Sequence, residues 1–320
     1  MRLATLQFNP SPTTPRTTNI AHADALLTNH TSSLQNLDLL ILPELAFTGY
    51  NHDSLKSIAP CLERSAGGPS AEWAKETARR LGCAVAVGYP EVEIKAQDGE
   101  QDGDEEERTY NSVVLVDKVG EVITNYRKRF LYYTDERWAC EGDAKEFWKG
   151  EVEVKSPPQE RSSNREGEHD EKKEKVKTAM GICMDINPYK FTAPWSDFEF
   201  ATHVLQSQAR LVLLSMAWLT TLDLEALKQK PQEPELGTLT YWVSRFEPLV
   251  DASSEHAESS FIIVFANRCG VEGDALYAGT SCVMEIAGGR VRIWDMLGKG
   301  TEGVLVVDTE EAPKYELKRK

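Results

Sequence analysis

The sequence has no apolar run long enough to cross a bilayer, and it is short of positive charge. It holds 36 lysine and arginine residues against 51 aspartate and glutamate residues, and its formal net charge is -15 at pH 7. Because binding to phosphates needs a basic patch, this balance argues against nucleic acid or an anionic membrane as the main partner. The first segment breaks at Asn9 and Pro10 and lacks the apolar core of a signal peptide.

Paired cysteines and metal-binding histidine motifs are also missing. The six cysteines are scattered without a CxxC pair, which predicts reduced thiols in a cytosolic or nuclear compartment. The six histidines lack metal-ligand spacing, and only His52 falls near a strand end. We therefore expect structural or surface histidines, no metal and no cofactor.

What the chain does contain is an alternation of apolar strand-like runs with helical patterns. A length of 320 residues suits one large α/β domain over residues 1–320 better than two small ones. A helix is predicted between Ser70 as N-cap and Gly82 as C-cap, and another over 198–209. Strands are predicted at 37–42, 84–89, 112–117, 121–126, 179–183, 211–216, 261–267, 281–286, 291–295 and 303–308.

Two segments do not fit this core. Residues 97–107 are entirely Asp, Glu, Gln and Gly, and residues 156–175 begin with Pro and Ser and continue with mixed Lys and Glu. Both are too polar to bury, so we predict solvated loops or partly disordered insertions. A role as docking tails is the alternative.

Three polar residues stand directly at predicted strand ends, where side chains of an open α/β sheet face a crevice. They are Glu44 in Leu-Pro-Glu-Leu, Lys128 in Tyr-Arg-Lys, and Cys183 in Gly-Ile-Cys-Met-Asp. Each alone has an ordinary explanation: a first-turn carboxylate, an exposed basic residue, or a buried cysteine. The combination in this order points to a shared site.

In this order, these three blocks resemble the signature motifs of the nitrilase superfamily of carbon–nitrogen hydrolases. The resemblance implies a nitrilase-like four-layer α-β-β-α sandwich and a catalytic triad of Glu44, Lys128 and Cys183. It also implies a second glutamate a few residues after the lysine. Glu136 in Thr-Asp-Glu-Arg-Trp is the best match, and a surface acid is the alternative reading of that residue.

The chemistry of these side chains fits that assignment. A free thiol has a pKa of about 8.5, so only a few per cent is thiolate at neutral pH. Glu44 can accept the thiol proton, pass it to departing ammonia and then activate a water. Lys128 favours the thiolate and stabilises the oxyanion, and the backbone N–H of Met184 is the natural second oxyanion donor.

The residues around Cys183 narrow the resemblance to one group within the superfamily. The stretches 181–191, 198–201, 216–219 and 241–249 resemble the fungal protein N-terminal amidases. That resemblance implies that the substrates are peptides or proteins with N-terminal Asn or Gln, which are deamidated to Asp or Glu for the N-degron pathway. Asp185 is a candidate for holding the substrate ammonium, or else caps the strand end. Trp218 is a candidate pocket wall, or else a core tryptophan.

Two other functions remain open from sequence. One is a small-molecule hydrolase, such as an ω-amidase or an N-carbamoyl amino acid hydrolase. The other is a noncatalytic scaffold on the same fold that binds peptide N-termini. The sequence does not identify an oligomeric interface.

Overall fold

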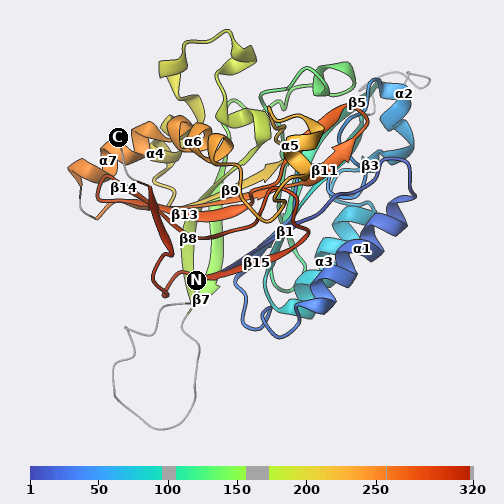
Figure 1. Cartoon of the computed structure of the whole chain (residues 1–320). Coiled ribbons are helices and arrows are strands. Elements are labelled where there is room, and N and C mark those ends of the chain that lie inside the picture. Colours follow the sequence, from blue (N-terminus) through green and yellow to red (C-terminus); the bar gives the residue numbers. More distant parts are fainter. Residues whose placement is uncertain (96–105, 156–172, 257, 318–320) are drawn as a thin grey trace.

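The computed structural model describes residues 1–95, 106–155, 173–256 and 258–317. In this part of the chain, the apolar runs form two β-sheets that pack face to face, with helices on the outer side of each sheet (Figure 1). This is the four-layer α-β-β-α arrangement that the resemblance to the nitrilase superfamily implies.

The first sheet has the strand order β15-β1-β2-β4-β5-β6, and β3 pairs with the distal part of β4. The strands β1, β2 and β4 run parallel, whereas β15, β5 and β6 are antiparallel to their neighbours. The bounds are β1 (Arg2–Gln7), β2 (Leu39–Ile41), β3 (Glu63–Arg64), β4 (Ala84–Lys95), β5 (Glu106–Val116), β6 (Val122–Arg127) and β15 (Gly303–Asp308).

The second sheet has the order β16-β14-β13-β10-β9-β8-β7, with β8, β9 and β10 parallel at its centre. The strands β11 and β12 form a separate two-stranded ribbon, and in the chain they fall between β10 and β13. The bounds are β7 (Trp148–Lys155), β8 (Lys173–Ile182), β9 (Leu211–Met216), β10 (Ser260–Asn267), β11 (Cys269–Glu272), β12 (Ala275–Ala278), β13 (Cys282–Ala287), β14 (Arg290–Met296) and β16 (Tyr315–Leu317).

The helices cover the two outer faces. Figure 1 shows α1 and α3 on the side of the first sheet, and α4, α6 and α7 over the second. None of the described helices combines the length and apolarity that crossing a bilayer requires. The bounds are α1 (Arg16–Asn29), α2 (Leu55–Ile58), α3 (Pro69–Leu81), α4 (Glu199–Ser207), α5 (Leu224–Lys228), α6 (Leu236–Arg245) and α7 (Glu247–Glu255), with 3₁₀ turns η1 (Ala59–Cys61), η2 (Asp135–Arg137), η4 (Cys183–Ile186), η5 (Tyr189–Phe191) and η6 (Trp195–Asp197).

The predicted strands are confirmed as elements, and the start of α3 is a correction. The helix begins at Pro69 rather than after a Ser70 cap, because Ser70 donates from its backbone N–H and its hydroxyl to Glu63, at 2.8 and 2.7 Å. Gly82 ends the helix in the left-handed conformation, with φ 67°, as predicted.

Most of the two predicted polar insertions, residues 97–105 and 156–172, lies outside the described residues. The remainder of each is a correction, because residues 106–107 belong to β5 and residues 173–175 to β8. These charged residues extend antiparallel ladders with β4 and β7.

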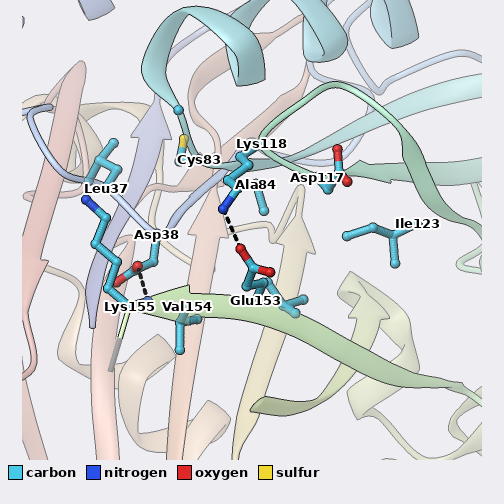
Figure 2. A pocket seen from close by; sticks show the side chains of 12 residues that line it. Leu37, Asp38, Cys83, Ala84, Asp117, Lys118, Ile123, Glu153, Val154 and Lys155 are labelled. Carbon is cyan, nitrogen blue, oxygen red and sulfur yellow. Dashed lines mark hydrogen bonds and ion pairs between the residues drawn. The ribbon is translucent and has the colours of Figure 1, made fainter. Parts of the chain in front are cut away.

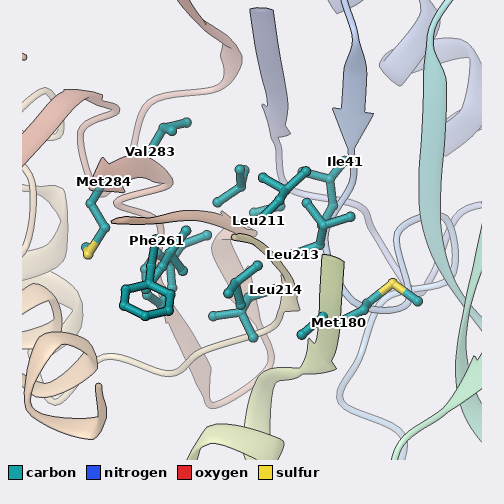
Figure 3. Close-up of a cluster of buried hydrophobic side chains, with 14 of the residues drawn as sticks. Ile41, Met180, Leu211, Leu213, Leu214, Phe261, Val283 and Met284 are labelled. Carbon is teal, nitrogen blue, oxygen red and sulfur yellow. The ribbon is translucent and has the colours of Figure 1, made fainter. Parts of the chain in front are cut away.

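The main core lies between the sheets and continues under the second helical layer. Figure 3 shows Ile41 of β2 close to Leu211 and Leu213 of β9, whereas Leu214 and Phe261 occupy the other face of β9 and β10. This alternation follows from the two-residue period of a strand, which sends successive side chains to opposite faces. A second core packs the outer face of the first sheet against α1 and α3.

The sheets are also joined at the end where β2 begins. The Asp38 carboxylate accepts from the backbone N–H groups of Arg2 at 2.7 Å and Lys155 at 2.8 Å. Figure 2 shows this contact and the Lys118–Glu153 ion pair around a crevice of about 110 Å³. None of the three predicted catalytic side chains lines this crevice. Glu44, Lys128 and Cys183 instead follow the C-terminal ends of β2, β6 and β8, at the other end of the sheets from this crevice.

We predict that Gly88→Ala destabilises the fold by about 1–3 kcal/mol, because overpacking a rigid contact costs this much. A methyl group on Gly88 would lie 2.7 Å from the Pro43 carbonyl oxygen and 2.8 Å from the Glu44 Cα, which are backbone atoms that cannot rotate away. Chemical denaturation measures the change.

Gly237→Ala is the matched control. It lies in α6 with no atom within 4 Å of the added methyl group. We expect it to stabilise the protein by roughly 0.5–1 kcal/mol, because alanine favours a helix over glycine. Equal stability changes in both variants would contradict the packing argument.

Candidate active site

Segments that follow strands of both sheets meet at one end of the sandwich. The Ser215 hydroxyl of β9 donates to the Leu42 carbonyl at 2.9 Å, and the Glu44 backbone N–H donates to the Met216 carbonyl at 3.3 Å. Glu44 follows β2, Lys128 follows β6 and Cys183 follows β8. These hydrogen bonds between the two sheets therefore help to bring residues from three strand ends into one place.

The Lys128 side chain is fully buried between two carboxylates. Its Nζ donates to Glu44 Oε1 at 2.5 Å and to Asp135 Oδ2 at 2.6 Å. Burial by itself lowers the pKa of Lys128, but the charges of Asp135 and Glu44 outweigh it and raise the pKa above its ordinary value. The ammonium is therefore a permanent charge in this site.

Glu44 is held at both oxygens. Oε1 also accepts from Asn111 Nδ2 at 2.7 Å, and Oε2 accepts from the backbone N–H of Ala217 at 2.9 Å. Burial raises the pKa of Glu44 to about 7, although Lys128 opposes this shift. A carboxyl group with that pKa can both accept and release a proton near neutral pH.

Cys183 occupies the sharp turn from β8 into η4. Its φ of 40° is in the left-handed region, which is unusual for a residue with a side chain and marks local strain. Burial, followed by the nearby charge of Glu44, raises the pKa of the Cys183 thiol well above its ordinary value, and Lys128 opposes this. The resting side chain is therefore a thiol that needs a base.

Asp185 fixes this turn, which corrects the predicted ammonium-binding role. Its side chain is fully buried, and Oδ2 accepts from the Ile182 backbone N–H at 2.8 Å and the Tyr126 hydroxyl at 2.7 Å. Oδ1 accepts from the backbone N–H groups of Arg129 at 3.1 Å and Phe130 at 2.9 Å. With four intramolecular donors, Asp185 acts as the strand-end cap that the sequence also allowed.

The prediction of Glu136 as the second acid is wrong about which residue lies beside Lys128. Glu136 is exposed, and its neighbour Asp135 is fully buried. Asp135 Oδ1 accepts from Asn111 at 3.1 Å, and Oδ2 accepts from the backbone N–H of Tyr132 at 3.0 Å. In the single turn η2, these adjacent side chains point to different environments, and Asp135 faces the site.

A cavity of about 170 Å³ opens beside Cys183. Four of the nine residues that line it are aromatic, and Trp218 is one of them, although its role in binding substrate stays a prediction. Met184, whose backbone N–H is the predicted oxyanion donor, lines the same cavity, and that role stays a prediction. The lining residues are Tyr50, Tyr132, Cys183, Met184, Asn187, Phe191, Ala217, Trp218 and Leu219.

Tyr50 is placed in this wall by a buried carboxylate from β11. Glu272 accepts from the backbone N–H groups of Tyr50 and Asn51, at 3.0 and 2.9 Å, and pairs with Arg268 at 2.7 Å. Gly49 has a φ of 76°, and a methyl group there would lie 2.3 Å from Glu272 Oε1. This close approach explains the glycine before Tyr50.

Sequence reasoning missed Asn111, which connects the two acids. An asparagine is unfavourable in the interior of a strand, so its position in the apolar run of β5 was the available signal. All six cysteines are free. Across the described ranges, no group of three or more His, Cys, Asp or Glu residues is arranged to hold a metal ion.

We predict that Asp135→Asn lowers the pH midpoint of Cys183 alkylation by iodoacetamide. After burial and Glu44, Asp135 is one of the anions that raise the pKa of this thiol, so removing its charge favours the thiolate at lower pH. The variant also weakens a partner of the buried Lys128, and we expect it to lose roughly 3–5 kcal/mol of stability. Peptide mapping at Cys183 and denaturant unfolding measure the two effects.

Glu136→Gln is the matched control, because it removes the same charge from the adjacent exposed position. It should leave both the alkylation midpoint and the free energy of unfolding unchanged. Identical shifts in the two variants would show that general acidity, and not contact with Lys128, sets the reactivity of the thiol.

Comparison with known proteins agrees with this geometry. The family model described as carbon–nitrogen hydrolase matches residues 2–186, which is more than half of the chain. A relative from Schizosaccharomyces pombe, named protein N-terminal amidase, is 32% identical over 308 residues, covering 92% of this chain and 94% of the relative.

Solved structures support the same fold. An N-terminal amidase with an Asn-Glu-Ala peptide superposes with a TM-score of 0.79 at 24% identity, covering 96% of this chain and 97% of the other. An N-terminal amidase with a Gln-Val peptide gives a TM-score of 0.78 at 24% identity, covering 96% of each chain. At this identity the likeness establishes the fold, and the family assignment follows from the sequence matches: the chain belongs to the carbon–nitrogen hydrolase family of the nitrilase superfamily.

Proposed function

We propose that this protein hydrolyses the side-chain amide of an N-terminal asparagine or glutamine in peptides and proteins. The products are ammonia and an N-terminal aspartate or glutamate. The observation that carries the proposal is the buried cluster of Glu44, Lys128 and Asp135, whose charges act on Cys183, together with the cavity that Cys183 lines. It supplies a nucleophile, a base and a fixed positive charge.

The first half-reaction forms a thioester. Cys183 Sγ attacks the carboxamide carbon while Glu44 accepts the thiol proton, and the carbonyl oxygen becomes an oxyanion. Lys128 and the Met184 backbone N–H stabilise that charge, and each such donor is worth roughly 100- to 1,000-fold in rate. The tetrahedral intermediate then expels ammonia, which takes the proton from Glu44.

The second half-reaction returns the enzyme to its starting state. A water enters after ammonia leaves, Glu44 accepts one of its protons, and the hydroxide attacks the thioester carbon. Collapse of this second intermediate breaks the carbon–sulfur bond, and Glu44 returns its proton to the Cys183 sulfur. The pKa of Glu44, raised to about 7 by burial, suits this repeated acceptance and release.

The relationship to the N-terminal amidases favours peptides over free amides as substrates. The relative from S. pombe matches over 92% of this chain and nearly its own whole length, so the likeness extends beyond the triad. The solved structures of that fold are described with peptides that begin with Asn or Gln.

The proposal predicts deamidation only at an unblocked N-terminus. Mass spectrometry of matched peptides with N-terminal Asn, N-terminal Gln, acetyl-Asn and internal Asn should show the deamidation mass change in the first two alone. Free glutamine, ω-amides and N-carbamoyl amino acids serve as competing substrates. Turnover of these small molecules without turnover of peptides would reject the N-terminal assignment.

We also predict that kcat/KM for the N-terminal peptide rises as the pH increases through about 7. Glu44 must be ionised to accept the thiol proton, and burial raises its pKa to about 7, so it is protonated on the acid side of this value. Initial rates of ammonia release across pH provide the measurement.

Three variants test the assignment of the base and the nucleophile. Glu44→Gln should lose activity by roughly 100- to 10,000-fold, which is the usual contribution of a general base. Cys183→Ala should release no ammonia, whereas Cys140→Ala, an exposed cysteine on the surface, should behave as wild type. Retention of full activity by Cys183→Ala would remove the nucleophile from the mechanism.

A further inference from the structure

The segment that follows Cys183 forms one wall of the cavity and is held in a strained conformation. Asn187 and Phe191 line the cavity. Lys190, Phe191 and Phe198 have φ values of 52°, 53° and 45°, in the left-handed region that side chains disfavour. Such conformations persist only where surrounding contacts determine them, so the contacts of this segment indicate what sets the wall.

Arg245 of α6 binds both ends of the segment. Its Nε donates to the Ile186 carbonyl at 2.8 Å, and its Nη1 donates to the Trp195 carbonyl at 2.7 Å. The guanidinium also lies 4.5 Å from the centre of the Trp195 ring, and the side chain is fully buried. The wall is therefore attached to α6 at two points.

Tyr241 lies one helical turn before Arg245 and therefore on the same side of α6. Its hydroxyl donates to Asn187 Oδ1 at 2.6 Å. Asn187 Nδ2 lies 3.4 Å from Met184 Sδ, which is a weak acceptor. The carboxamide thus uses its strong acceptor on Tyr241, and its amide nitrogen has a second N–H left for another acceptor.

The Asn187 side chain is not needed to shape the turn after Cys183. Its backbone N–H closes that turn by donating to the Met184 carbonyl at 2.8 Å, and the Asp185 carboxylate holds the preceding residues. A buried amide that lines the cavity, and whose orientation is set from another helix, has the arrangement of a substrate-binding group.

We propose that Asn187 donates a hydrogen bond to a main-chain carbonyl of the peptide substrate, and that Tyr241 is the positioning residue that orients it. This rests on the proposed function, because the carbonyl belongs to the peptide bond that follows the N-terminal residue. The contact lies outside the reacting amide, so it contributes to binding in the ground state and the transition state alike. Its loss raises KM and leaves kcat unchanged.

The test compares Tyr241→Phe, Asn187→Ala and the double variant on an N-terminal Asn peptide. Tyr241→Phe keeps the ring and removes only the hydroxyl, and we expect KM to rise roughly 3- to 10-fold, as for the loss of one hydrogen bond. Asn187→Ala should raise KM at least as much. In the double variant, Tyr241→Phe should add nothing, because it acts only through Asn187.

Two further measurements separate positioning from damage to the fold. The rate of Cys183 alkylation by iodoacetamide should be unchanged in Tyr241→Phe, since this small reagent does not need the peptide contact. Thr240→Ala, at an exposed position on the same helix, is the matched control and should leave KM, kcat and alkylation unchanged.

The outcomes are distinct. A rise in KM with additive effects in the double variant, or a fall in kcat together with slower alkylation, would overturn the inference and leave the proposed function intact. An unchanged KM in Tyr241→Phe would also overturn it. If the wild type deamidates no peptide with N-terminal Asn or Gln, the proposed function fails and this inference fails with it.

Discussion

The ammonium of Lys128 is the charge around which the site is organised. A lone ammonium in a protein interior costs several kcal/mol, and partners on two sides are needed to offset that cost. Glu44 and Asp135 provide them at 2.5 and 2.6 Å, one from the segment after β2 and the other from η2. The fold therefore has to hold these two segments at a set separation, and Asn111 bridges their carboxylates from β5.

Buried carboxylates serve two different purposes near this cavity. Glu44 and Asp135 accept from a cation and belong to the charged cluster. Asp185 and Glu272 accept several backbone N–H groups and so hold the turns that carry Cys183 and Tyr50, and Glu272 also pairs with Arg268. The same side-chain chemistry thus supplies reactivity in one pair and rigidity in the other. Asp185 holds the turn in which Cys183 has its strained φ.

Much of the fold was readable from local pattern. The two strands on either side of Gly120, the left-handed Gly82 after α3 and the buried strands around β9 all follow from short-range signals in the sequence. The incorrect predictions also came from local patterns. Ser70 was predicted to cap the helix, but its backbone N–H and its hydroxyl both donate to Glu63, which lies on a separate strand. The pairing of β15 with β1 joins strands that lie far apart in the sequence, and no local pattern specifies such a partner.

By itself, the sequence determined that Glu44, Lys128 and Cys183 follow strands in a fixed order, and this order was enough to indicate a carbon–nitrogen hydrolase. Only the tertiary structure decided that Asp135, and not Glu136, faces Lys128, and that Asp185 caps a turn. The physical reason is that the direction of a side chain on a short turn depends on what packs against it. Glu44 and Lys128 are 84 residues apart in the chain, so their contact exists only once the two strand ends have been brought together by folding.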